Sequence, residues 1–138
     1  MEWIAYFLLY SFIGWIIDSG YRSWVDRKWT MGNALKPLPF APVYGFGAIF
    51  VLIVEPVVGH WAIVFQWLAY GVLLAILEGF SGMFSTEIFG KPLWKYHRSN
   101  SFDGYTDIWH AAIWGLLALV LTWVMHPVFM SMWFKLST

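Results

Sequence analysis

Four long apolar runs, separated by short polar segments, constrain the fold of this 138-residue chain more than any other feature. They cover about residues 3–25, 40–58, 61–89 and 108–126. Each is close to the ~20 residues that an α-helix needs to cross a hydrocarbon core of ~30 Å. A soluble fold is excluded, because only 12% of the residues are charged. So few charged residues cannot cover the surface of a soluble protein of this size. We therefore predict an all-α polytopic membrane protein whose four transmembrane helices form a compact bundle in the lipid bilayer.

The ends of the chain are expected to belong to the same single transmembrane domain, residues 1–138. The first apolar run follows Met1-Glu2 directly, without the basic segment or the cleavage site of a signal peptide, and predicts a retained helix. Residues 127–138 are too few to cross a bilayer and are expected to lie at its interface. The chain has no cysteine and no excess of basic residues, which excludes disulfides, thiolate chemistry and nucleic-acid binding.

The basic residues predict how these helices are oriented in the membrane. Four follow the first run and three follow the third, whereas only Lys135 lies elsewhere. The seven are Arg22, Arg27, Lys28, Lys36, Lys91, Lys95 and Arg98. Because lysine and arginine accumulate in cytoplasmic loops, residues 26–39 and 90–106 are expected in the cytoplasm and both termini outside. In a prokaryote this membrane would be the cytoplasmic membrane.

Small residues at helical spacing predict where the helices approach each other closely. The third run carries Gly71, Ala75 and Gly79, and the fourth carries Gly115 and Ala118 on a similar stripe. Helices in lipid associate through such close contacts, because lipid supplies little hydrophobic drive for association. We expect these faces to meet inside the bundle. Contacts between copies in a homo-oligomer would use the same residue types and are the alternative.

The two halves of the chain resemble each other. Residues 16–21, Ile-Ile-Asp-Ser-Gly-Tyr, are similar to residues 76–81, Ile-Leu-Glu-Gly-Phe-Ser. Each half would comprise a helix that enters the cytoplasmic side, a basic loop and a helix that returns. A 2+2 tandem repeat of this kind places Asp18 and Glu78 at equivalent depths, with the halves related by an axis along the membrane normal. Chance similarity is the alternative, because the composition is strongly biased.

Two carboxylates lie deep in the apolar runs, Asp18 in the first and Glu78 in the third. An ionisable group at such a depth costs ~2.5 kcal/mol or more, so it is a functional candidate. Other polar residues are expected on the same side of the membrane. The candidates for binding a substrate or an ion are Asp18, Arg22, Tyr44, Glu78, Glu87, Arg98, Asp107 and His110. Together they predict a carboxylate-lined cavity that opens to the cytoplasm.

The two buried acids also have a purely structural interpretation. Asp18 and Arg22 have the four-residue spacing of an ion pair on one helix face, which lessens the cost of insertion without any chemistry. Glu78 could form an ion pair with Lys91 or Arg98, or lose its charge through desolvation. Ion pairing and ligand binding are both left open at this point.

The residues at the start of the fourth run have structural alternatives as well. Asp107 suits the N-terminus of a helix, where an acidic side chain is favourable. His110 lies three residues later and so on the same helix face. A histidine near carboxylates could ligate a metal, but no spacing comparable to a known ligand motif is present. We therefore expect neither a metal nor a cofactor.

Six short motifs extend over most of the chain in a fixed order. They are Phe7–Asp18 (with Tyr10-Ser11 and Gly14-Trp15), Pro42-Val43-Tyr44-Gly45-Phe46-Gly47, Leu77-Glu78, Trp94-Lys95-Tyr96, Trp114-Gly115 and His126-Pro127. Over about residues 7–127 they resemble the ABC-transporter type IV (CmpB-like) family of membrane proteins. The resemblance implies the family's fold and membrane location, and it favours Tyr44 and Glu78 as functional residues. The chain departs from the pattern at Asp18, where Glu is usual, and at Lys95, where Asp is usual.

Three functions are compatible with these features. The first is a small transport or channel-like component in which Asp18 and Glu78 bind a cation, a proton or a basic substrate. The chain has no Walker motif, so coupling to ATP would need a separate ATPase or other subunit. The alternative is a membrane-embedded enzyme that acts on a lipid or lipophilic substrate, with Glu78 or Asp18 as acid or base. The third is an accessory or assembly protein without chemistry.

Overall fold

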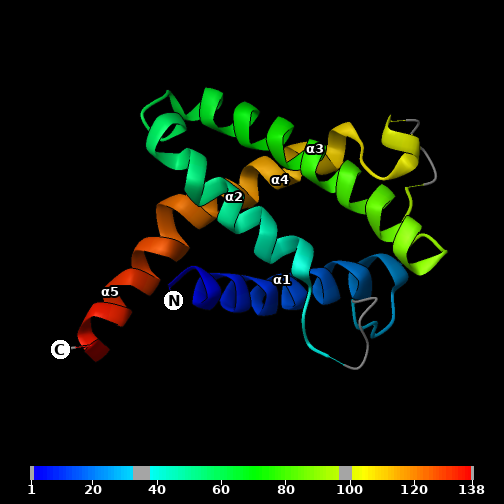
Figure 1. Cartoon of the computed structure of the whole chain (residues 1–138), viewed down its shortest axis with the longest axis horizontal. Helices are drawn as coiled ribbons and strands as arrows, with labels where there is room; N and C mark the ends of the chain where they lie inside the picture. Colours follow the sequence, from blue (N-terminus) through cyan, green and yellow to red (C-terminus); the bar gives the residue numbers. More distant parts are fainter. Residues whose placement is uncertain (1, 33–37, 97–100, 138) are drawn as a thin grey trace. The chain divides into compact units, whose positions relative to one another are not determined.

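A computed structural model describes residues 2–32, 38–96 and 101–137 (Figure 1). This part of the chain is helical and contains no strand, as the sequence predicts. The helices are α1 (Glu2–Asp26), α2 (Pro42–Val58), α3 (Ile63–Phe89), the 3₁₀-helix η1 (Ser101–Gly104), α4 (Ile108–Val120), the π-helix η2 (Leu121–Met125) and α5 (His126–Ser137). The chain divides into two compact units, unit 1 (Met1–Phe50) and unit 2 (Val51–Thr138), each of which is described by itself.

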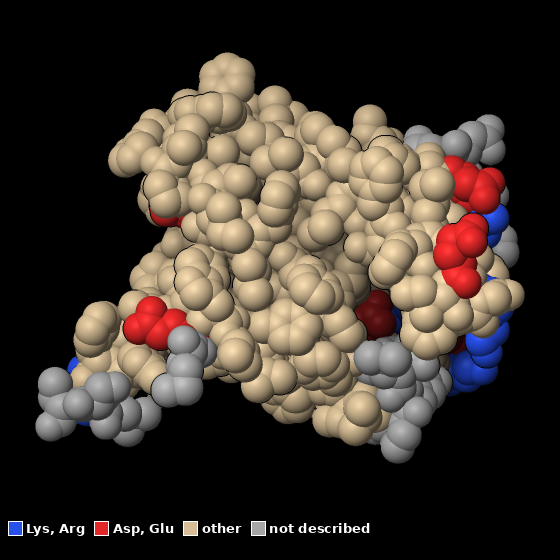
Figure 2. Space-filling model, in the orientation of Figure 1, with Lys and Arg blue, Asp and Glu red and all other residues tan. Residues whose placement is uncertain are grey.

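Three helical segments are long and apolar enough to cross a membrane, namely Glu2–Asp26, Ile63–Phe89 and Ile108–Lys135. The remaining expected span, residues 40–58, corresponds to α2, which is apolar but shorter, with 17 residues. Large apolar side chains lie exposed on every α-helix, and the visible surface carries few charged residues (Figure 2). An outer surface of this kind suits lipid rather than water.

The last helix does not end at His126-Pro127, where the sequence analysis places the end of the fourth run. Helical structure continues from Ile108 to Ser137 through the π-helix η2. Proline has no backbone N–H and normally interrupts the helical ladder. Just before Pro127 the hydrogen-bond pattern changes to that of a π-helix, because the His126 N–H donates to the Leu121 carbonyl, five residues earlier. The interfacial location of residues 127–138 stays a prediction.

In unit 1 the two helices approach each other so closely that only glycine fits at the contact. A Cβ atom added to Gly14 would overlap the Tyr44 side chain. One added to Gly45 would overlap the Ser11 hydroxyl and would lie 2.8 Å from the Phe7 carbonyl oxygen. The Ala41 N–H donates to the Ser11 carbonyl at 3.0 Å, which ties the start of α2 to the middle of α1.

The segment that follows α1 folds back along the helix and is held there by two serines. The Ser23 hydroxyl accepts from the Thr30 N–H at 2.9 Å and lies 3.0 Å from the Thr30 carbonyl oxygen. The Ser19 hydroxyl, one turn earlier, accepts from the Gly32 N–H at 3.0 Å. These side chains supply backbone partners that the irregular segment cannot provide for itself.

In unit 2, α3 and α4 lie side by side and meet through the small residues that the sequence predicts as a contact (Figure 1). A Cβ atom on Gly71 would lie 2.7 Å from the Ala111 carbonyl oxygen, and one on Gly115 would overlap the Trp67 carbonyl and indole. The Trp67 indole N–H donates to the Ala112 carbonyl at 2.9 Å. At these positions the expectation of contacts within the chain is confirmed.

Gln66 fixes the other end of the α3 and α4 pair. Its amide nitrogen donates to the carbonyls of Gly59 and Trp61, at 3.1 and 2.7 Å, in the turn that precedes α3. Its amide oxygen accepts from the Trp123 indole N–H at 3.1 Å, which joins η2 to α3. Gln66 is almost completely buried, and both ends of its amide are satisfied.

Candidate functional site

Glu78 is a buried carboxyl in α3, with 4% of the residue exposed. The Tyr96 hydroxyl donates a hydrogen bond of 2.8 Å to its Oε1 atom. Oε2 is also buried, and no described residue makes a hydrogen bond to it that meets ordinary distance and angle limits. The side chains of Thr106 and Trp114 lie close enough to interact with the carboxyl group, as does His110.

Tyr96 reaches Glu78 because the segment before α4 packs onto the end of α3. The Tyr96 N–H donates to the Gly104 carbonyl at 2.8 Å, and the Trp94 indole N–H donates to the Tyr105 carbonyl at 3.0 Å. The Tyr105 hydroxyl and the Thr86 hydroxyl of α3 share a hydrogen bond of 2.6 Å. The aromatic rings of this segment therefore cover the turn of α3 that carries Glu78.

Two glycines of α3 make room for this cover. A Cβ atom on Gly79 would lie 2.6 Å from the Phe102 ring, and one on Gly82 would overlap the Tyr105 ring. Phe102 and Asp103 have φ angles of +47° and +55°, which is the left-handed region that side chains other than glycine rarely adopt. Such a conformation costs about 1–3 kcal/mol per residue, so the packing around Glu78 holds the segment in place.

His110 and Asp107 complete the group at the start of α4. The His110 ring stacks on the Tyr96 ring, with centroids 3.7 Å apart and planes 11° apart. Its Nδ1 atom lies 2.8 Å from Oδ1 of Asp107, and the same oxygen accepts from the His110 backbone N–H at 2.8 Å. Asp107 is thus the N-cap of α4, as its position in the sequence predicts. We call Glu78, Tyr96, Asp107 and His110 the Glu78 cluster.

Burial and hydrogen bonding have opposite effects on the pKa of Asp107, which precedes the membrane-spanning part of the last helix. Burial by itself would raise the pKa of this carboxyl. Hydrogen bonds from the backbone N–H and the ring of His110 outweigh burial and hold the pKa of Asp107 below its ordinary value. The carboxylate is therefore the form that caps α4 at neutral pH.

We expect replacement of Asp107 with alanine to lower the stability of the protein by about 1 kcal/mol at pH 7, because the N-cap is lost. Since folding lowers the pKa of Asp107, its contribution is complete above pH ~3.9 and disappears as the pH falls through the lower folded pKa. Asp107→Asn keeps a cap and removes this acid dependence. Unfolding in detergent across this pH range measures both effects. Equal stability of the alanine variant and the parent at pH 7 would contradict the assignment.

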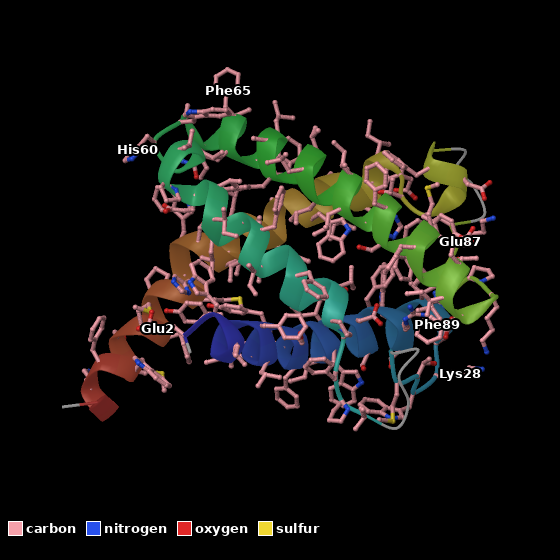
Figure 3. All side chains as sticks on the ribbon, in the orientation of Figure 1. Glu2, Lys28, His60, Phe65, Glu87 and Phe89 are labelled. Carbon is pink, nitrogen blue, oxygen red and sulfur yellow. The ribbon has the colours of Figure 1, made fainter. Side chains whose placement is uncertain are left out.

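The structure brings three of the eight sequence candidates together in unit 2, namely Glu78, Asp107 and His110. Glu87 is exposed near the end of α3 (Figure 3) and is not a member of the cluster. Arg98 lies outside the described residues, as do His97 and Lys36. The proposed ion pair of Glu78 with Lys91 is wrong, because Lys91 is exposed and the carboxyl binds the Tyr96 hydroxyl instead.

The other three candidates belong to unit 1. Oδ2 of Asp18 accepts from Nε of Arg22 at 2.9 Å, so the ion pair that the four-residue spacing indicates is present. Tyr44 packs against Gly14 at the contact between α1 and α2. Asp18 and Glu78 belong to different units, and the sequence leaves open whether they share one cavity.

Tyr96 is a candidate functional residue that the sequence did not indicate. Tyr96 lies in an irregular segment, 18 residues from Glu78, so no helical spacing connects the two. The available signal was its place in the Trp94-Lys95-Tyr96 motif, directly before the expected fourth helix. Within the part of the chain that the structure describes, no three His, Asp or Glu side chains gather as a metal site.

A family profile with the description "Putative ABC-transporter type IV" matches residues 5–138. The chain belongs to this family. The match covers the Glu78 cluster and confirms the resemblance that the six motifs carry. No curated protein and no solved structure matches the chain. Membership in the family, together with the three helices able to cross a bilayer, identifies an integral membrane protein related to ABC transporters.

Proposed function

We propose that the protein is a transport component of the membrane in which Glu78 binds a proton or a small cation. One observation carries the proposal. Glu78 is buried in a membrane-spanning helix, one of its oxygens accepts from Tyr96, and the other has no well-formed hydrogen bond or ion pair among the described residues. A buried carboxyl without a lysine or arginine partner is costly and is retained where it serves the passage of ions or protons.

The other residues of the Glu78 cluster hold this carboxyl in place and can return a proton to it. The Tyr96 hydroxyl fixes Oε1, so that Oε2 is the atom available to the proton or cation. His110 stacks on Tyr96 and contacts Asp107, which caps α4 just before the membrane-spanning part of the last helix. An imidazole ring has one nitrogen that donates and one that accepts, so His110 is placed to pass protons between the loop side of unit 2 and Glu78.

We also propose that the protein has the four membrane spans that the sequence predicts. Although α2 has 17 residues, this is the lower limit for a helix that crosses a bilayer. With four spans, Arg22 near the end of α1 and the six basic residues in the two loops favour a cytoplasmic location for residues 26–39 and 90–106. The Glu78 cluster then lies at the cytoplasmic end of a carboxylate-lined cavity. The family description supports a separate ATPase as a partner.

Reconstitution into vesicles tests this function. Purified protein in vesicles that contain a pH-sensitive dye, or that receive radioactive Na⁺, is exposed to an imposed membrane potential. We expect Glu78→Gln to reduce the flux about tenfold or more, because it removes a charged binding group whose interactions contribute about 1.5–3 kcal/mol. The amide has nearly the same size as the carboxyl and leaves the packing of α3 intact.

Glu87→Gln is the matched control, since Glu87 belongs to the same helix but is exposed and outside the Glu78 cluster. Its flux is expected to equal that of the unmodified protein. Protein-dependent flux that Glu78→Gln leaves unchanged would contradict the proposal, and so would the absence of any protein-dependent flux of protons or Na⁺.

A further inference from the structure

The two units use the same contacts between their helices. Gly45 packs against the carbonyl and ring of Phe7 in unit 1, and Gly115 packs against the carbonyl and indole of Trp67 in unit 2. In each pair the aromatic residue of unit 2 comes sixty positions later, and the glycine comes seventy positions later. Unit 2 therefore has ten more residues between these positions, and they are shared among a longer α3, a longer connection before α4 and an earlier start of α4.

A second pair of contacts has the same offsets. The Ala41 N–H donates to the Ser11 carbonyl in unit 1. In unit 2 the corresponding residues Ala111 and Gly71 also touch, since a Cβ atom on Gly71 would lie 2.7 Å from the Ala111 carbonyl oxygen. The first helix of each unit thus contacts equivalent residues, one in the second helix and one at or just before its start.

The two units also correspond in the contacts of their loops and in one buried tyrosine each. Ser19 binds the Gly32 N–H, and the corresponding Gly79 packs against the Phe102 ring. Tyr10 and Tyr70 are both buried at equivalent positions of α1 and α3. The similarity extends beyond residues 16–21 and 76–81 to contacts between distant parts of the chain, which biased composition does not explain.

This correspondence makes Asp18 the counterpart of Glu78, and it makes Arg22 the counterpart of Gly82. In unit 1 the Arg22 guanidinium pairs with the Asp18 carboxylate at 2.9 Å, and the Gly32 backbone packs against that carboxylate. In unit 2 the position of Arg22 has no side chain, and the Tyr105 ring fills the space beside Gly82. The two units therefore differ in the residue that lies beside the equivalent carboxyl group.

We propose that Asp18 is a second carboxyl site of the same kind as Glu78, closed by Arg22. The guanidinium of Arg22 takes the place of the proton or small cation that Glu78 binds. The protein then has one working site, in unit 2, and one permanently neutralised site, in unit 1. This inference rests on the proposed function of Glu78, but it concerns a different residue and can fail separately.

Labelling with dicyclohexylcarbodiimide tests it on the whole protein in detergent. This apolar reagent reacts with a carboxyl that takes up a proton in apolar surroundings. The carboxyl oxygen and its proton add across one C=N bond, and rearrangement gives an N-acylurea without a leaving group or an oxidant. Mass spectrometry of the intact protein counts the labels, and peptide mapping assigns them to Asp18 or Glu78.

We expect one label on the unmodified protein, at Glu78, and two labels on Arg22→Met, at Glu78 and Asp18. Combining Arg22→Met with Asp18→Asn returns the count to one. Arg22→Lys keeps a cation beside Asp18 and is expected to keep it unlabelled. Lys28→Met removes an exposed charge from the same loop and is the matched control, with one label. Added Na⁺ slows the labelling if the site takes a small cation, and has no effect if it takes only protons.

Two results would contradict the proposal that Arg22 closes a carboxyl site at Asp18. Labelling of Asp18 in the unmodified protein would show that Arg22 does not close it. Arg22→Met protein that keeps the helical content and elution volume of the parent, yet gains no label at Asp18, would show that no second site exists. Absence of label at Glu78 would count against the proposed function alone, because Asp18 in the Arg22→Met protein is assigned independently.

Discussion

Replacing Gly115 with leucine is expected to separate α3 from α4 and to destabilise the protein by about 3 kcal/mol or more. A Cβ atom alone would overlap the Trp67 carbonyl and indole, so the larger side chain must displace a backbone. The displacement also threatens the 2.9 Å hydrogen bond from Trp67 to the Ala112 carbonyl. Unfolding in a titration with sodium dodecyl sulfate measures the loss.

Gly20→Ala is the control for this variant, because a Cβ atom at Gly20 meets nothing within 4 Å. Alanine in the interior of α1 is expected to leave the stability unchanged or to raise it by up to ~1 kcal/mol. A Gly115→Leu protein as stable as the parent would show that α3 and α4 do not pack at this distance.

Replacing Tyr96 with phenylalanine is expected to reduce both stability and flux. The change removes only the hydroxyl that donates to Glu78 at 2.8 Å and leaves the ring stacked on His110. A buried carboxyl oxygen without its partner costs about 1–3 kcal/mol, which corresponds to about a 5- to 150-fold loss of flux. Detergent unfolding and vesicle flux measure the two effects.

A double-mutant cycle separates the role of Tyr96 from a general loss of packing. In protein that already carries Glu78→Gln, the Tyr96→Phe change is expected to have a much smaller effect on flux, because its partner has been altered. Equal and additive effects of the two changes would mean that the hydroxyl does not act through Glu78. Tyr96→Ala, which also removes the stack on His110, is expected to be more damaging than Tyr96→Phe.

The parts of the site that the sequence predicted are those determined by helical spacing. Asp18 and Arg22 are four apart, and Asp107 and His110 are three apart, so each pair lies on one helix face before any tertiary structure is known. The helices themselves are predicted within about three residues of their observed ends, except at the last one, because the apolar runs are long and sharply bounded.

The parts that the sequence could not predict depend on contacts between distant segments. Tyr96 reaches Glu78 only because the Phe102 and Tyr105 rings pack against glycines of α3. No spacing rule states which of seven tyrosines will bind a given carboxyl. The continuation of the last helix past Pro127 was missed for another reason. A single π-helical turn shifts the hydrogen bonds locally, and nothing in the apolar pattern indicates such a shift.

The proposed 2+2 repeat lies between these two cases. A short stretch around Asp18 and Glu78 indicated it, but the matching contacts of Gly45 and Gly115 became visible only in the folded units. Comparing the units also shows what changed between them. Arg22 in one unit and Gly82 in the other decide whether the equivalent acid has a permanent cation beside it.

The most direct test of the account is an infrared difference spectrum of the protein in lipid, recorded as the pH or the Na⁺ concentration is changed. If Glu78 binds a proton or a small cation, a carboxylic C=O stretching band will change with these conditions and will be missing from Glu78→Gln. Glu87→Gln will keep the band. Spectra of the unmodified protein and of Glu78→Gln that respond identically to pH and to Na⁺ would contradict the central claim.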